Sequence, residues 1–415
     1  MRSKVFGVRK VIMAQRAQSV LATKDVFQKG DFHWKQFNVE TSSASSSTPK
    51  PLLIFTPIVP GSYPVILFCH GFFIHNSFYS EFLGHIALHG FILVAPQLIM
   101  AQRAQPALAT TDVFQKGDIH WKQFNVETST ASSSPPKPLL IFTPTVPGLY
   151  PVILFCHGFC IRTSYYSKLL AHIVSHGFIL VAPQLFSIGV PMFGPEEVKC
   201  EGRVVDWLDN GLQPLLPESV EAKLEKLVLV GHSKGGKTAF AVALGYCKTK
   251  LKFSALIGID PVAGVSKCKP CRSLPDILTG VPRSFNLNIP VAVIGTGLGP
   301  EKANSLFPPC APNGVNHKEF FSECKPPSAY FVATDYGHMD MLDDETPGVI
   351  GTMMSKCMCK NGKKGPRDLM RRTVGGLVVA FLRAQLNEQW KDFDAILASP
   401  NLAPAKLDDV RYLPT

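Results

Sequence analysis

The sequence of 415 residues lacks an unbroken hydrophobic segment long enough to cross a membrane as a helix. The best candidate, residues 52–74, contains no Asp, Glu, Lys or Arg, but Pro57, Pro60 and Pro64 interrupt it. This pattern predicts two short strands. The amino terminus also lacks the apolar core of a secretory signal. It is basic and has no acidic residue before Asp25, which resembles an organelle transit peptide.

Charged residues are scarce, at 18%, whereas hydrophobic residues make up 46% of the chain. This composition excludes a disordered protein and indicates a large core. The net charge is +11, but the basic residues are scattered and no nucleic-acid-binding motif accompanies them, so nucleic acid is not expected as a partner. The densest basic cluster comprises Lys356, Lys360, Lys363, Lys364, Arg367, Arg371 and Arg372. One interpretation is a solvated loop that leads into a helix. The other is a surface that contacts an anionic membrane, in which case the protein would associate with the membrane peripherally.

A regular cysteine framework is missing as well, although the chain has 11 cysteines. Two close pairs stand out, Cys268 with Cys271 and Cys357 with Cys359, and Cys310 and Cys324 lie between them. Three interpretations stay open at this point: a zinc site, one or two disulfides, or ordinary thiols.

An internal repeat dominates the first half of the chain, because residues 13–98 recur as residues 100–185. By direct comparison, 17 of the 86 aligned positions differ, so the copies are far more alike than solenoid repeats. Only one copy can fill a given place in a sheet, and the second copy runs directly into unique sequence. We therefore expect residues 100–415 to form one complete domain, and residues 1–99 to be a redundant, poorly packed partial copy whose strand edges lack partners.

The stretch Leu227–Phe240, LVLVGHSKGGKTAF, carries the clearest chemical signal. Four apolar residues predict a buried strand, the G-x-S-x-G motif follows, and a helix-forming run comes next. Strand, G-x-S-x-G and helix together are the nucleophile elbow of an α/β-hydrolase. The pattern predicts that Ser233 lies on a strained turn whose neighbours two positions away must be glycines. The alternative is a glycine-rich turn with an idle serine.

Two further polar residues follow predicted strands. Asp260 ends the apolar run 254–259, and His338 comes shortly after the run 330–333. The carboxyl ends of parallel strands share one edge of a sheet, so both side chains are expected beside Ser233. The order serine, acid, histidine is that of α/β-hydrolases. Glu301, after the strand 291–294, is the weaker candidate for the acid.

These residues predict ester hydrolysis. Ser233 attacks the carbonyl, His338 transfers the proton, and Asp260 orients the imidazole. The strand 152–155 ends in His157-Gly158-Phe159, where this fold places its oxyanion loop, so the backbone amides of Phe159 and Lys234 are the expected oxyanion donors. His157 and His232 are interpreted as structural. No metal and no organic cofactor is required.

The remaining pattern predicts an α/β fold with a mostly parallel central sheet and helices on both faces. Helices are expected over 165–175, 198–212 and 367–386, and the last of these is expected to be the amphipathic helix that closes the domain. The run 330–333 is expected to be the last clear strand. The segment 186–195 is interpreted either as a cap over the site or as a loop packed on the core. The apolar candidates for a substrate cleft are Phe186, Met192, Phe193, Met339 and Met341, all of which suit a core equally well.

At this point five separated segments resemble plant chlorophyllases: PVILFCHGF, SHGFILVAPQL, GHSKGGKTAF, ALIGIDPVAG and ATDYGHMD. The resemblance covers residues 100–415. It implies hydrolysis of the phytyl ester of chlorophyll, or of a related phytylated porphyrin, to chlorophyllide and phytol by Ser233, Asp260 and His338. Family members usually carry Arg at the position of Lys234, but the expected role needs only the backbone amide.

Two rival hypotheses remain. One is a general carboxylesterase or lipase for apolar esters that uses the same residues. The other is a catalytically inactive, duplicated pigment-binding protein. The resemblance implies a chloroplast location, with the cytosol or another endomembrane as the alternative.

Overall fold

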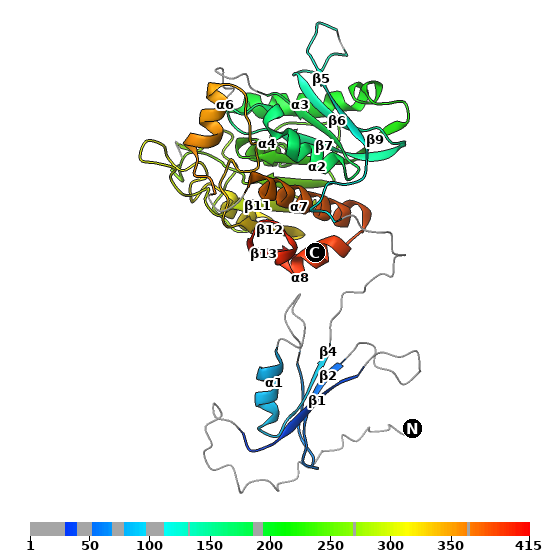
Figure 1. The fold of residues 1–415 in the computed structure, drawn as a ribbon, viewed down its shortest axis with the longest axis vertical. Coiled ribbons are helices and arrows are strands. Elements are labelled where there is room, and N and C mark those ends of the chain that lie inside the picture. Colours follow the sequence, from blue (N-terminus) through cyan, green and yellow to red (C-terminus); the bar gives the residue numbers. More distant parts are fainter. Residues whose placement is uncertain are drawn as a thin grey trace, which may run out of the picture. The chain divides into compact units, whose positions relative to one another are not determined.

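The computed structural model describes residues 30–39, 52–68, 79–96, 112–131, 133–185, 194–268, 271–362 and 366–415. The chain divides into two compact units, Met1–Pro106 and Ala107–Thr415 (Figure 1). Each unit has its own sheet and its own core. Phe186, Met192 and Phe193, three of the expected substrate contacts, lie outside the described residues, as does most of the segment 186–195.

The second unit is built on a sheet whose described strands follow the order β13-β12-β11-β10-β9-β7-β8-β6-β5. Neighbours from β8 to β12 are parallel, and β5, β6 and β13 join the two ends of the sheet antiparallel. The strands are β5 (Trp121–Val126), β6 (Leu139–Pro144), β7 (Gly148–Cys156), β8 (Ile179–Pro183), β9 (Val220–His232), β10 (Ala255–Ile259), β11 (Val291–Thr296), β12 (Ser328–Ala333) and β13 (Leu407–Leu413).

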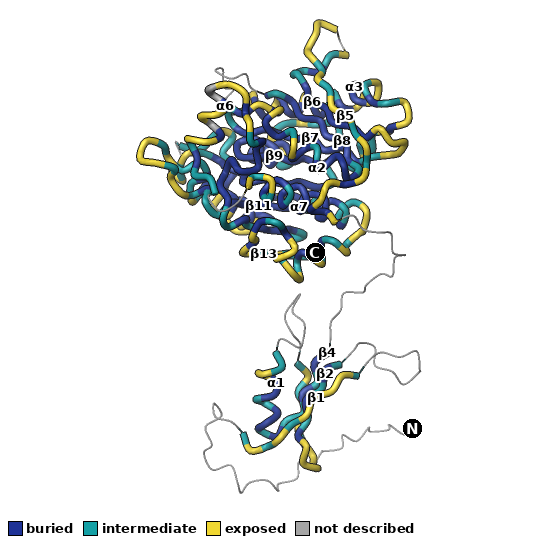
Figure 2. Tube along the Cα trace, viewed as in Figure 1, coloured by how far each residue is buried: buried dark blue, intermediate teal, exposed yellow. Residues whose placement is uncertain are grey.

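Helices cover both faces of this sheet, and Figure 2 shows the buried chain concentrated in the sheet between them. One hydrophobic cluster contains α2 and α7, and the other contains α3, α4 and α5. The helices are α2 (Ser167–Val174), α3 (Pro195–Gly211), α4 (Lys234–Ala243), α5 (His317–Glu323), α6 (Val349–Met353), α7 (Arg367–Asn387) and α8 (Lys391–Ala398). The predicted fold class is confirmed.

Strand β9 shows how the sequence produces two cores. Val228 and Val230 pack in the cluster of α2 and α7, whereas Leu227 and Leu229 pack in the cluster of α3 and α4. Successive side chains of a strand point to opposite faces, so a continuous apolar run is what a strand covered on both faces requires.

Two expectations about the carboxyl terminus were wrong. Strand β13 follows β12 in the sheet and pairs with it antiparallel, so 330–333 is not the last strand. Its sequence, LDDVRYL, exposes two aspartates because β13 is an edge strand, and this charge hides the strand pattern. Helix α7 does not close the domain, because α8 follows it, and most of α7 is buried rather than amphipathic.

Among the described residues one disulfide is formed, between Cys310 and Cys359. Cys268 and Cys357 are exposed thiols, and Cys324 is a buried one. Within the described ranges, no three His, Cys, Asp or Glu side chains gather as metal ligands would. No described helix is both long enough and apolar enough to cross a membrane.

The first unit repeats the beginning of the second. Its strands β1 (Trp34–Val39), β2 (Leu52–Pro57), β3 (Val65–Leu67) and β4 (Ile92–Pro96) form a sheet in the order β1-β2-β4-β3, with α1 (Ser80–Ala87) packed on it. The register is conserved: Trp34 pairs with Pro57 as Trp121 pairs with Pro144. The core of this unit is small and comprises Leu53, Phe55, Leu83, Ala87, Leu93 and Ala95.

Identical residues are exposed in the first unit and buried in the second. Val65 and Leu67 on β3 are 65% and 64% exposed, whereas their counterparts Val152 and Leu154 on β7 are 0% exposed. In the second unit β7 pairs with β8 on one side and with β9 on the other. In the first unit the equivalent strand, β3, has only β4 as a described neighbour. The first copy therefore carries the sequence of a central strand at the edge of a sheet.

A charge substituted at the two equivalent leucines tests this difference. We expect Leu154→Asp to destabilise the second unit by roughly 3–5 kcal/mol, because it places an unpaired charge in a core. Leu67→Asp should change the free energy of unfolding of the first unit by less than about 0.5 kcal/mol, because Leu67 is already exposed. Urea unfolding of both full-length variants, followed by tryptophan fluorescence, measures both values. An equally large loss for Leu67→Asp would show that β3 is covered.

Candidate active site

The site is organised by the turn between β9 and α4. Ser233 has a φ of 57°, in the left-handed region that side chains rarely adopt. The turn closes only because its flanking residues are glycines. A Cβ on Gly231 would lie 2.3 Å from the Gly235 carbonyl oxygen, and one on Gly235 would lie 2.2 Å from the Cys156 oxygen. The sequence pattern and the local geometry thus have the same cause.

The structure brings the three expected side chains together at the carboxyl ends of their strands. His338 Nε2 lies 2.7 Å from Ser233 Oγ, and His338 Nδ1 lies 2.7 Å from Asp260 Oδ2. All three residues are buried, with Ser233 8% exposed. Nδ1–H donates to the carboxylate, which leaves Nε2 to accept the hydroxyl proton. This is the hydrogen-bond order that a serine nucleophile needs.

Asp260 is a fully buried carboxylate whose negative charge is stabilised by hydrogen bonds. Besides His338, Thr296 donates to it twice, from Oγ1 at 2.6 Å and from the backbone N–H at 3.3 Å. Burial would raise the pKa of Asp260, but the hydrogen bond and charge of His338 outweigh it, with help from His317 and Thr296, and lower the pKa to about 2. The carboxylate is therefore ionised throughout the neutral range.

Sequence reasoning missed Thr296, which ends β11 beside β10. The pattern after β11 indicated only a candidate for the acid. Glu301, the weaker candidate for that role, is exposed and lies 3.9 Å from Lys360 Nζ. The adjacent strand end supplies a hydroxyl donor instead, and its signal was a threonine at the carboxyl end of a parallel strand.

The segment that the sequence analysis proposed as the oxyanion loop follows β7, which ends at Cys156. Phe159 is half-buried, and the carbonyls of Cys156 and His157 pack against Gly235 at the start of α4. Lys234 is the first residue of α4, so its amide belongs to the helix amino terminus, where the backbone favours negative charge. The structure thus places the two predicted donor residues on neighbouring backbone segments.

His232 and Tyr166 connect this loop to the loop of His338. The Gly158 N–H donates to Tyr166 Oη at 3.0 Å, the tyrosine hydroxyl donates to His232 Nδ1 at 2.7 Å, and His232 Nε2–H donates to the His338 carbonyl at 2.9 Å. Burial lowers the pKa of His232 well below its ordinary value, so the ring is neutral, as these hydrogen bonds require. His232 has the structural role that we predicted.

His157 also lies away from the reacting atoms. Its Nδ1–H donates to the Gly158 carbonyl at 2.8 Å, and its Nε2 accepts from the Leu185 N–H at 2.9 Å. Burial lowers the pKa of His157 to about 4. The neutral ring therefore links the oxyanion loop to the end of the chain segment that follows β8.

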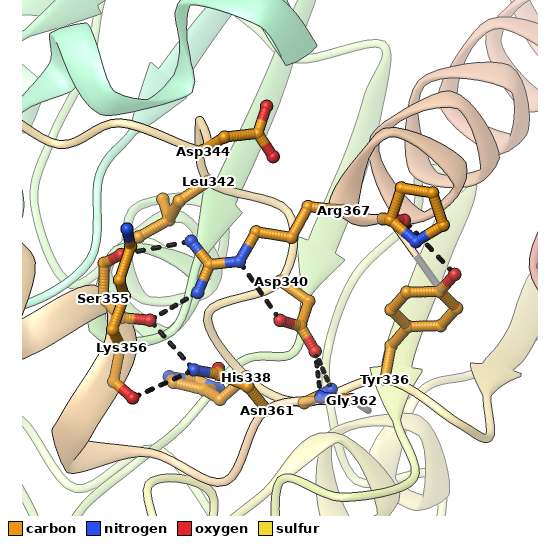
Figure 3. Close-up of polar contacts among 12 residues, drawn as sticks. Tyr336, His338, Asp340, Leu342, Asp344, Ser355, Lys356, Asn361, Gly362 and Arg367 are labelled. Carbon is orange, nitrogen blue, oxygen red and sulfur yellow. Dashed lines mark hydrogen bonds and ion pairs between the residues drawn. The ribbon is translucent and has the colours of Figure 1, made fainter. Parts of the chain in front are cut away.

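The loop that carries His338 is held from the other side by a buried carboxylate (Figure 3). Asp340 Oδ2 accepts from the N–H groups of Gly337 and Gly362, both at 2.7 Å. Arg367 lies between Asp340 and Ser355, with its Nε 3.3 Å from Asp340 Oδ1. Arg367 belongs to the basic cluster found in the sequence, so at least this member of the cluster is structural.

Met339 and Met341, the described candidates for the substrate cleft, are buried in the cluster of α2 and α7. They are 4% and 0% exposed, which is the core arrangement that the sequence left open. Met339 directly follows His338 in the chain, so its burial in this cluster anchors the loop of the histidine to the core.

Comparison with known proteins identifies the family. The family model for chlorophyllase matches residues 22–107 and again 109–414, once for each copy of the repeat. The chain is 51% identical over 306 residues to chlorophyllase-1 of Arabidopsis thaliana, covering 73% of this chain and 93% of the relative. It is 54% identical over 262 residues to chlorophyllase-2 of the same plant, covering 62% and 80%.

A protein from Citrus unshiu named chlorophyllase-1, chloroplastic, is 48% identical over 309 residues, covering 74% of this chain and 90% of that protein. The chain belongs to the chlorophyllase family. It is therefore a carboxylic-ester hydrolase with an α/β-hydrolase fold, and the family resemblance drawn from the five sequence segments is confirmed.

This member of the chlorophyllase family also buries the acid Glu201 of α3. Glu201 is 0% exposed, and neither carboxyl oxygen has a hydrogen-bond partner at good geometry among the described residues. Burial raises the pKa of Glu201 to about 7, the nearby Cys156 thiol offsets this only weakly, and the charge of Glu197 adds to it.

The folded chain thus keeps a proton on Glu201 that the unfolded chain releases above its ordinary pKa of 4.5. Because the folded state binds more protons between pH 4.5 and 7, stability falls as the pH rises through this window. We expect Glu201→Gln to remove this slope. The stability difference between variant and wild type should move by roughly 3 kcal/mol in favour of the variant between pH 4.5 and 8, measured by urea unfolding. An unchanged difference would mean that Glu201 is ionised in the fold.

Asp260→Asn tests the hydrogen-bond order of the site. The amide retains the shape of the side chain but can no longer hold His338 Nδ1 as the donor, so we expect kcat to fall about 10⁴-fold with little change in KM. Hydrolysis of a short nitrophenyl ester provides the measurement. A loss below tenfold would assign the acid to another residue.

Proposed function

We propose that the chain hydrolyses the phytyl ester of chlorophyll, yielding chlorophyllide and phytol, with Ser233 as nucleophile, His338 as general base and Asp260 as the group that orients it. The observation that carries this proposal is the pair of 2.7 Å contacts that join Ser233, His338 and Asp260 in one buried row. The substrate comes from the relatives, whose names are those of chlorophyllases at 48–54% identity.

The proposed reaction uses these contacts. His338 Nε2 takes the proton of Ser233 Oγ as the oxygen attacks the ester carbonyl carbon, and the imidazolium that forms is stabilised by Asp260. The amides of Phe159 and Lys234 bind the oxyanion, and each such donor is worth about 3 kcal/mol in the transition state. His338 then protonates the phytyl oxygen as the ester C–O bond breaks, and phytol leaves.

Water completes the cycle. His338 Nε2 removes a proton from the water as its oxygen attacks the acyl-Ser233 carbonyl, and the proton passes to Ser233 Oγ as the acyl bond breaks. Chlorophyllide leaves as a carboxylate. Each step uses side chains of this chain and water.

Residues 100–415 form the complete catalytic domain in this proposal, and residues 1–99 are a redundant partial copy. Ser233, Asp260 and His338 all belong to the unit Ala107–Thr415, and the exposed edge of β3 supports the view that the first copy lacks its partners. The chloroplastic relatives from Citrus support a chloroplast location. Among the described members of the basic cluster, Lys356, Lys360 and Arg372 are at least partly exposed, and they would favour peripheral contact with an anionic membrane that holds the pigment.

The direct test is release of chlorophyllide from detergent-solubilised chlorophyll by the full chain, followed by partition between hexane and aqueous acetone. We expect turnover by the wild type and a loss of at least 10³-fold in Ser233→Ala, since the nucleophile is removed. A short nitrophenyl ester is assayed in parallel. Hydrolysis of that ester but not of chlorophyll would indicate a general esterase, and inactivity of the folded wild type on both would indicate a non-catalytic protein.

A further inference from the structure

The side chain of Lys234 is buried, although the proposed reaction uses only its backbone amide. Its side chain is 10% exposed, and its Nζ lies 2.6 Å from Glu197 Oε2. The same ammonium lies 5.5 Å from the centre of the Phe159 ring, within the range of a cation–π contact. Lys234 thus joins α3 to the oxyanion loop through its charge.

Glu197 lies in the first turn of α3 and is 1% exposed. It contacts α4 at two positions one turn apart. Oε2 accepts from Lys234, and Oε1 accepts from the hydroxyl of Thr238. Burial raises the pKa of Glu197, but the charge and hydrogen bond of Lys234 and the hydroxyl of Thr238 oppose that rise. The carboxylate has the partners that a buried anion requires.

Stability alone does not explain this ion pair. Removing two charges from water costs several kcal/mol per ion, and replacing a buried pair by apolar residues is often neutral or stabilising. An exposed pair lies next to it on the same helix: Glu196 lies 2.7 Å from Lys199 with both side chains more than half exposed, and such pairs contribute little. We therefore look for the role of the buried pair in the site and not in the stability of the fold.

The oxyanion donors need such a link because they come from separate segments. Phe159 follows β7, and Lys234 follows β9 at the start of α4. A donor stabilises the oxyanion only when its nitrogen lies about 2.7–3.1 Å from it, so a small displacement of one segment weakens both hydrogen bonds. Gly235 lets the two backbones touch, but a backbone contact does not fix the position of Phe159 along the loop.

We propose that Glu197 is a positioning residue for the oxyanion hole. It holds the Lys234 ammonium over the Phe159 ring, and this ammonium bridge fixes the two donor amides relative to each other. The inference rests on the proposed function, because it assigns a support to that same site.

Glu197→Gln in the full chain tests the proposal, with Glu196→Gln as the matched control. The glutamine can still accept from Thr238, but it no longer neutralises the Lys234 ammonium. We expect kcat on a short nitrophenyl ester to fall roughly 10- to 100-fold, less than the loss on removing a whole donor, with KM within about twofold. Affinity for a trifluoromethyl ketone, whose adduct carries an oxyanion, should fall by the same factor. Glu196→Gln should match the wild type in every measurement.

Phe159→Leu provides the second measurement. It removes the ring but keeps the amide, so it should reproduce the loss in kcat, and the double variant Glu197→Gln/Phe159→Leu should be no worse than either single variant. Independent, multiplied losses would overturn the proposal, as would a wild-type kcat in Glu197→Gln.

Two further outcomes separate the possible failures. If Glu197→Gln unfolds, the neutral pair Glu197→Gln/Lys234→Met replaces it, and a wild-type kcat in that pair also overturns the proposal. If the wild type and Glu196→Gln show no ester turnover that depends on Ser233, the proposed function itself fails.

Discussion

The buried carboxylate of Asp260 is the group on which the rest of the site depends. An anion with no exposure to water is tolerated only when donors surround it, and here Thr296 and His338 provide them. Because Thr296 and Asp260 end adjacent parallel strands, the sheet itself fixes the carboxylate. The carboxylate then fixes the tautomer and direction of His338, and His338 determines which lone pair faces Ser233. The chain of constraints thus runs from strand register to proton transfer.

The two copies of the repeat show how far burial depends on context. Nearly the same sequence forms the same four strands in the same register in both units, so local pattern and turn chemistry are sufficient for these elements. Only the second copy continues into β9, and only there does β7 become a central strand. The identical residues of β3 remain at an edge. A strand of central-sheet sequence without its partner is a hazard for aggregation, which is the physical cost of this duplication.

The sequence was sufficient to predict the fold class and to place Ser233, Asp260 and His338, because each follows a strand and parallel strands end at a common edge. It was not sufficient for the groups that support them. Tyr166 and Glu197 act through contacts with residues far away in the chain, and nothing in their local pattern marks them. Thr296 is marked only by its position at the end of a strand. Strand β13 was not predicted, because the charged residues that protect an edge strand also interrupt its alternation of apolar and polar residues. Periodicity thus reveals what faces the core, whereas side-chain networks become visible only in three dimensions.

Labelling with a serine-reactive fluorophosphonate tests most directly the central claim that Ser233 is activated by His338 and Asp260. The full chain is treated at neutral pH, and the modified residue is located by peptide mass spectrometry. The account predicts a single phosphonylated site at Ser233, absent in Ser233→Ala and formed at least 10³-fold more slowly in His338→Ala. Equal labelling in His338→Ala, or a label on another serine that persists in Ser233→Ala, would contradict it.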